Sequence, residues 1–107
     1  MISPLDQNAL DKFKALVATQ ATVHKMILFG SRARGQADPQ SDMDVLVVLD
    51  GPVGDEIRDY VSDCAWEAGF EHGIVLVPVV FSRSEWEDGP ERHSLLVQAI
   101  QTEGLPV

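Results

Sequence analysis

The sequence contains little cysteine, few aromatic residues, few basic residues and no long hydrophobic run. Because Cys64 is the one cysteine, no internal disulfide can form, and a reducing, cytoplasmic compartment is expected. No apolar run approaches the roughly 20 residues that cross a bilayer, which argues against a membrane protein. Residues 1–10 also lack the basic start and apolar core of a signal peptide, so none is expected.

Basic residues are outnumbered by acidic ones, with 8 Lys and Arg against 17 Asp and Glu and a net charge of −9. This balance argues against a broad basic surface, so direct binding of nucleic acid is not expected. A small local anion site is still compatible with it. With 107 residues, 45% of them hydrophobic, the chain fits one globular domain over residues 1–107.

The pattern of apolar and turn-forming residues predicts an α/β chain in the order helix, strand, loop, strand, helix, strand, helix. The first helix is expected to begin with Ser3 as its cap and Pro4 at its first position. The later elements are predicted at Met26–Phe29 (strand), Ser31–Ser41 (loop with about one helical turn), Asp44–Leu49 (strand), Asp55–Ala68 (helix), Ile74–Phe81 (strand) and Glu91–Glu103 (helix).

Two of these elements carry further expectations. The strand Ile74–Phe81 is continuously apolar, which predicts burial on both faces, while Pro78 predicts an edge position or a bulge because proline has no N–H. Ser82 and Glu85 form a plausible capping box for a short turn that carries Trp86. The last helix is expected to bury Leu95, Leu96, Ala99 and Ile100 and to stop at Gly104.

Two aspartates stand two residues apart at the start of the second predicted strand. In an extended chain the side chains of Asp42 and Asp44 point to one face, about 6.6 Å apart along the backbone. Two converging carboxylates suit Mg²⁺, which binds one or two carboxylates together with substrate phosphates. Asp42 and Asp44 are therefore the candidate metal ligands and catalytic residues.

The end of the preceding strand offers groups that suit a phosphate. Gly30 has no Cβ, so backbone N–H groups can approach an anion closely, and the Ser31 hydroxyl can donate to a phosphate oxygen. Arg32 or Arg34 could add a guanidinium fork, although either could equally be a solvated loop cation. Together with the aspartate pair, these residues predict a site for Mg²⁺ and a nucleoside triphosphate such as ATP.

The stretch Gly-Ser-Arg-Ala-Arg-Gly, followed by Ser-Asp-x-Asp-x-Leu-Val-Val, resembles the minimal nucleotidyltransferases of the DNA polymerase beta-like nucleotidyltransferase superfamily. The resemblance covers nearly the whole chain. It implies a small mixed β-sheet flanked by helices and Mg²⁺-dependent transfer of a nucleoside monophosphate, usually AMP, from a triphosphate to a hydroxyl. It further implies an antitoxin whose partner is a helical HEPN-type toxin, with a tyrosine of the toxin as acceptor.

The sequence departs from this family at one position. Active members usually carry a third acid on the strand after the central helix, and Val75 stands where we would look for it. Glu71 and Glu85 are the nearest acids along the chain. The departure leaves three consequences open: weak catalysis, nucleotide binding without turnover, or an acid that a partner chain supplies. The alternative to an enzyme is thus a module that binds nucleotide or covers a partner protein.

The remaining candidates lie outside this motif. Trp66 and Phe70 fall opposite the apolar stripe of the central helix; packing against the terminal helices is the commoner arrangement, and the alternative is an exposed pair that serves a homo-oligomer or a partner. Cys64 lies on the apolar stripe and is expected to be a core residue. The histidines His24, His72 and His93 have no metal-ligand spacing.

Overall fold

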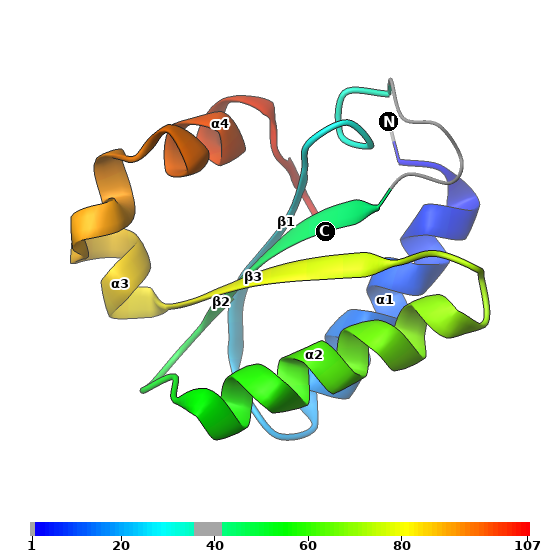
Figure 1. The fold of residues 1–107 in the computed structure, drawn as a ribbon, viewed down its shortest axis with the longest axis horizontal. Coiled ribbons are helices and arrows are strands. Elements are labelled where there is room, and N and C mark those ends of the chain that lie inside the picture. The colour runs from blue at the N-terminus through cyan, green and yellow to red at the C-terminus, as the bar shows by residue number, and fades with distance from the viewer. Residues whose placement is uncertain (1, 36–41) are drawn as a thin grey trace.

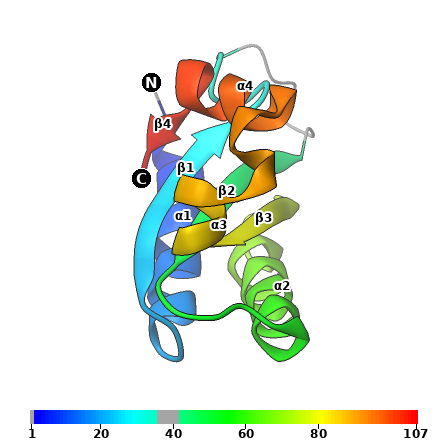
Figure 2. The ribbon, with the colours of Figure 1, turned by 90° about the vertical axis from the view of Figure 1, so that its left-hand side faces the viewer.

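The computed structural model describes residues 2–35 and 42–107, which form a four-stranded mixed sheet with helices on both faces (Figure 1, Figure 2). This architecture confirms the predicted α/β class and the predicted order of elements. The elements are α1 (Pro4–Ala18), β1 (Val23–Phe29), β2 (Met43–Leu49), α2 (Asp55–Phe70), β3 (Leu76–Ser82), α3 (Arg83–Asp88), the 3-10 turn η1 (Pro90–His93), α4 (Leu95–Glu103) and β4 (Leu105–Pro106).

The predicted helix starts are confirmed where side chains cap them. The Ser3 hydroxyl accepts the Asp6 N–H at the start of α1, with Pro4 in the first turn. At α3, Ser82 and Glu85 form a complete capping box, and Trp86 of this helix is buried. Within the described ranges, no helix is both long and apolar enough to span a membrane.

The strands lie in the order β3-β2-β1-β4. β1 pairs antiparallel with β2 and with β4, whereas β2 and β3 run parallel and are joined by α2. β1 is longer than the sequence predicts and starts at Val23, and the short strand β4 has no counterpart in the predicted elements. Leu105 of β4 pairs with Leu28, so the end of the chain becomes an edge of the sheet.

The sheet separates two apolar clusters. On the side of α1 and α2, fully buried side chains such as Phe13, Met43 and Val61 pack together. On the side of α3 and α4, Phe29, Leu46 and other residues pack against Trp86 and Ile100. Figure 1 shows α3 and α4 on one side of the strands and α1 and α2 on the other. Alternate residues of β2 thus serve opposite faces, as strand geometry requires.

The prediction that Ile74–Phe81 is buried on both faces is wrong at its start. Val75 is 60% exposed and Val77 is 38% exposed. The cause is the position of β3 at an edge of the sheet, where α3 covers the end of the strand but not its beginning. The edge position itself confirms the expectation drawn from Pro78.

The predicted helix Glu91–Glu103 is interrupted. The Ser94 hydroxyl accepts the Val97 N–H and caps α4, so the residues before it form η1 instead. Within α4, Val97 and Ile100 face the core. The predicted stripe is therefore wrong for three of its four members: Leu95 (84% exposed), Leu96 (43% exposed) and Ala99 (exposed).

Candidate functional site

The Gly30 turn and the Asp44 carboxylate lie side by side at one end of the sheet. Phe29, the last residue of β1, pairs with Asp44 of β2, so Gly30 follows directly beside the carboxylate. Gly30 has a φ of +77°, and a Cβ at this position would lie 2.5 Å from Asp44 Oδ2. Both observations require glycine here, the first because of the left-handed backbone and the second because of the close approach.

Asp44 lies in β2, and Asp42 directly precedes this strand. The residue between them, Met43, is fully buried in the cluster under α1 and α2, and its N–H donates to the Val75 carbonyl at 2.8 Å. Because side chains alternate along extended backbone, the two carboxylates point the other way. The sequence prediction that they share a face is consistent with this geometry.

The electrostatics of the pair favour a cation. Burial raises the pKa of Asp44 above its usual value, and the nearby charge of Asp42 raises it further. The two neighbouring carboxylates provide the oxygen ligands that Mg²⁺ prefers, and a bound cation would favour the ionised form of Asp44. The residues present therefore fit a magnesium ion held by two carboxylates and completed by phosphate oxygens.

The third acid is absent from the described part of this site. Val77 is the strand partner of Asp44, and Val75 accepts the Met43 N–H. Across residues 2–35 and 42–107, no group of three or more His, Cys, Asp or Glu side chains could hold a metal ion. The sequence points to Val75 and not to Val77, because the register between β2 and β3 cannot be obtained from local pattern.

The two nearby glutamates have other partners. Glu71 forms an ion pair with Lys12 at 2.8 Å, and this hydrogen bond lowers the pKa of Glu71. Glu85 accepts the Ser82 backbone N–H in the capping box, which lowers the pKa of Glu85, and it lies 3.7 Å from Arg58. Each carboxylate is thus stabilised in its ionised form by these partners, Glu71 at the end of α2 and Glu85 in the first turn of α3.

The turn after Gly30 is closed by its backbone and by its arginines. The Arg34 N–H donates to the Gly30 carbonyl at 3.2 Å, and Ser31 within the turn is half-buried. The Arg32 guanidinium donates to Asp6 of α1 at 2.9 Å, and both side chains are largely buried. Arg34 donates to Glu103 of α4 at 2.8 Å on the surface. The arginines therefore connect the turn to α1 and α4, and their predicted contact with phosphate stays a prediction.

Asp6 is a member of this neighbourhood that sequence reasoning missed. It stands in the first turn of α1, where an acid is expected simply to favour the helix dipole. The rest of the predicted loop, including Ser41, lies outside the described residues.

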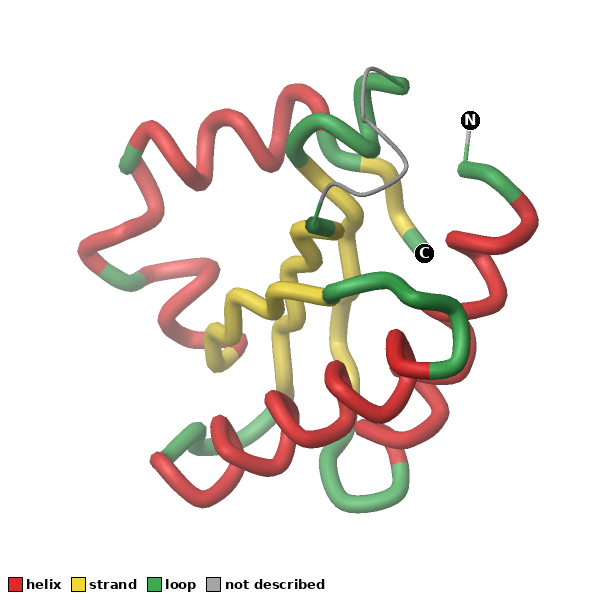
Figure 3. The backbone as a smooth tube through the Cα atoms, turned by 45° about the vertical axis from the view of Figure 1, so that its right-hand side comes forward, coloured by secondary structure: helices red, strands yellow, loops and turns green. Residues whose placement is uncertain are grey.

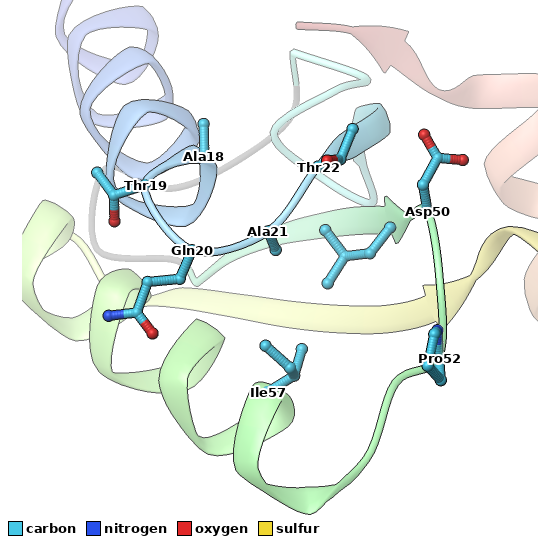
Figure 4. A pocket seen from close by; sticks show the side chains of 9 residues that line it. Ala18, Thr19, Gln20, Ala21, Thr22, Asp50, Pro52 and Ile57 are labelled. Atoms are coloured by element: carbon cyan, nitrogen blue, oxygen red, sulfur yellow. The ribbon is translucent and has the colours of Figure 1, made fainter.

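A hollow of about 420 Å³ lies at the other end of the sheet (Figure 4). Thr19, Thr22, Asp50 and Ile57 are among the residues that line it. β2 runs the seven residues from Met43 to Leu49 between the two ends, which is about 20 Å at the usual rise of a strand. This hollow is therefore separate from the carboxylate site.

The comparisons with known proteins identify the family of the chain. A family model described as a nucleotidyltransferase domain matches residues 9–93, which include Gly30, Ser31, Asp42 and Asp44. Over 60 residues the chain is 40% identical to a protein of Methanocaldococcus jannaschii named "Putative protein adenylyltransferase MJ0604". The match covers 56% of this chain and 55% of that protein, so it spans about half of the relative's length.

A solved structure described as "Crystal structure of the toxin-antitoxin with AMP-PNP" has the same fold. Its alignment gives a TM-score of 0.64 at 20% identity, covering 92% of this chain and 71% of the other. At this identity the likeness shows the fold. Since the family model extends over most of the chain and includes the glycine-serine turn and the aspartate pair, the chain belongs to the nucleotidyltransferase domain family.

Proposed function

We propose that this protein transfers AMP from ATP to a hydroxyl group of another protein, with a tyrosine of a HEPN-type toxin as acceptor, and so acts as an antitoxin. The observation that carries the proposal is the approach of the Gly30 turn to Asp44, which supports a phosphate site at the turn beside a metal site at the aspartate pair. The name of the Methanocaldococcus jannaschii relative supports protein adenylylation. The similar structure of a toxin-antitoxin with AMP-PNP supports a protein partner and an adenine nucleotide.

In this mechanism the chain binds and orients the triphosphate. Asp42 and Asp44 would hold Mg²⁺, which neutralises phosphate charge and makes the α-phosphorus more electrophilic. The Ser31 hydroxyl and the N–H groups of the turn would donate to phosphate oxygens. The acceptor hydroxyl loses its proton to water, its oxygen forms a bond to the α-phosphorus, the bond from that phosphorus to the bridging oxygen breaks, and pyrophosphate leaves.

The missing third acid bears on the choice of acceptor. Val75 and Val77 offer no group that could take the proton of the attacking hydroxyl. A tyrosine phenol has a pKa of about 10 and releases its proton much more readily than an aliphatic alcohol. A phenol is therefore the acceptor that such a site can use best.

The experiment is incubation of the protein with α-labelled ATP, Mg²⁺ and a HEPN-type protein. Transfer of label to the HEPN-type protein, and its loss in Asp42→Asn and Asp44→Asn, supports the proposal. Mutation of each candidate tyrosine to phenylalanine in the acceptor identifies the site.

The valines at Val75 and Val77 favour one second candidate, a module that binds nucleotide or covers a partner without turnover. Binding of the partner that persists in Asp42→Asn and Asp44→Asn, with no transfer of label by the wild type, identifies this module. Introduction of a carboxylate by Val75→Asp or Val77→Asp then tests whether the lost group is sufficient to restore transfer.

A further inference from the structure

An exposed apolar surface covers the outer side of α2 and the free edge of β3. Trp66 and Phe70 of α2 are each 69% exposed, and their rings stack with centroids 4.9 Å apart. With Val75, Val77 and Pro78 they line a hollow of about 580 Å³. We call these five residues the α2–β3 surface. The expectation that Trp66 and Phe70 pack against the terminal helices is thus wrong, and the alternative of an exposed pair is confirmed.

This surface extends to the edge of the carboxylate site. Val77 is the strand partner of Asp44, and its side chain lies on the same face of the sheet. Figure 1 and Figure 3 show that the loop from α2 leads into β3 at the end of the sheet where β2 begins. A molecule that is bound on Trp66 and Phe70 and extends over Val77 would therefore border Asp44.

The edge of β3 offers little to an added strand. Because the Val75 carbonyl faces β2, the peptide groups of Leu76, Pro78 and Val80 face outward. Pro78 has no N–H, and the Val80 carbonyl accepts a hydrogen bond from Arg58 at 2.9 Å. An occupant must consequently be held through side chains rather than through a strand ladder.

Acidic side chains lie beside the aromatic pair on α2. Asp59 and Asp63 are exposed and, at helical spacing, share the face of α2 that carries Trp66 and Phe70. If a second copy of this chain bound here, Asp59 and Asp63 would face the same acids of the other copy. Each copy also carries a net charge of −9, so the two copies would repel each other. A nucleotide, which is itself an anion, would be repelled as well. The chemistry instead matches a protein that presents apolar side chains flanked by Lys or Arg.

We propose that the α2–β3 surface docks the acceptor protein through an apolar anchor flanked by basic side chains, and so delivers the acceptor hydroxyl past Val77 to Asp44. The anchor packs on Trp66 and Phe70, and the basic side chains pair with Asp59 and Asp63. This inference rests on the proposed function for the delivery of the hydroxyl, whereas the docking can be tested by itself.

The docking test uses two synthetic peptides of equal length, each with two leucines four residues apart and one tyrosine. One peptide has lysines on both sides of the leucines, and the other has glutamates there. Trp66 fluorescence is followed in the Trp86→Phe background, since Trp86 is the other tryptophan and is buried.

The lysine peptide is expected to shift the Trp66 emission to the blue and to bind at least about tenfold more tightly than the glutamate peptide. Asp59→Asn with Asp63→Asn is expected to remove most of that preference. Equal binding of the two peptides, or binding of neither, overturns the docking. A wild-type dimer that Trp66→Glu converts to a monomer overturns it too, because the surface then belongs to a second copy.

The delivery test measures transfer of labelled AMP to the tyrosine of the lysine peptide. Trp66→Ala with Phe70→Ala is expected to lower kcat/KM at least about tenfold and to leave binding of Mg²⁺ and ATP unchanged. Leu95→Ala is the matched control, because Leu95 is 84% exposed on α4, away from this surface.

The two failures can be told apart. Label transfer that the double variant does not reduce overturns the delivery role while the proposed function stands. Peptide binding together with no transfer of label to a HEPN-type protein, where ATP still binds, contradicts the proposed function but supports the docking surface.

Discussion

At the scale of single residues, Gly30 links the backbone of the turn to the position of the Asp44 carboxylate. In Gly30→Ala, the left-handed backbone costs about 1–2 kcal/mol of unfolding free energy, and the new Cβ displaces Asp44 Oδ2. We expect this variant to lose magnesium-dependent binding of ATP, measured by calorimetry. Gly35→Ala is the control, since Gly35 has a φ of +71° with no described atom within 4 Å of a new Cβ. It should cost similar stability and still bind; equal binding by both variants would contradict the assigned role of Gly30.

Asp44 makes the stability of the protein depend on pH. Its pKa in the folded state is raised above the ordinary value of 3.8, so the folded state binds more protons than the unfolded state between these two values. Stability contributed by the neutral carboxyl is therefore lost as the pH rises through the folded-state pKa. We expect Asp44→Asn to melt at a higher temperature than the wild type at pH 7 without Mg²⁺, and this gain to shrink below pH 4.

Thermal melts across pH check this expectation. Mg²⁺ should raise the melting temperature of the wild type at pH 7 but not that of Asp44→Asn. A gain in Asp44→Asn that stays constant from pH 3 to pH 7 would show that the carboxylate charge is not its cause.

At the scale of elements, two ion pairs connect the Gly30 turn to helices on opposite faces of the sheet. The Arg32–Asp6 pair has side chains 7% and 13% exposed, whereas Arg34 and Glu103 are 43% and 37% exposed. Less water around the first pair strengthens its interaction. A double-mutant cycle with Arg32→Met and Asp6→Asn is expected to give a coupling free energy of about 1–3 kcal/mol. The matching cycle on Arg34 and Glu103 should give less than about 1 kcal/mol.

The same variants show whether Arg32 supports the turn through Asp6 or contacts the phosphate directly. If Arg32 acts mainly through Asp6, Asp6→Asn and Arg32→Met should weaken ATP binding by similar factors. A much larger loss in Arg32→Met would assign Arg32 a direct contact with the nucleotide. Calorimetry measures ATP binding by Asp6→Asn and Arg32→Met, and denaturant unfolding measures the stability of the same two variants.

The elements also differ in how far local sequence predicts them. Ser3 and Ser82 signal helix starts correctly, because capping hydrogen bonds join residues only three apart. Ser94 uses the same chemistry, yet the helical spacing of Leu95, Leu96 and Ile100 favours a longer helix with a different buried face. The burial of α4 is decided by its contact with β1, and periodicity alone cannot supply that contact.

At the scale of the whole molecule, the excess of acidic residues lowers the free energy of unfolding. Acidic residues outnumber basic ones by nine, so repulsion among them opposes folding. We expect the melting temperature to rise by a few degrees between about 20 mM and 500 mM NaCl, because salt shortens the Debye length from roughly 20 Å to about 4 Å. KCl should act equally. A fall in melting temperature would mean that attraction within the surface ion pairs outweighs the repulsion.

The sequence by itself determined the family motif, the helix caps and the candidate pair Asp42 and Asp44, because these depend on residues close together along the chain. The tertiary structure decided that Val77 lies beside Asp44, that Arg32 reaches Asp6 and that Trp66 stays exposed. These facts arise from strand register and from which helices cover which part of the sheet. They join residues tens of positions apart, and no local spacing encodes them.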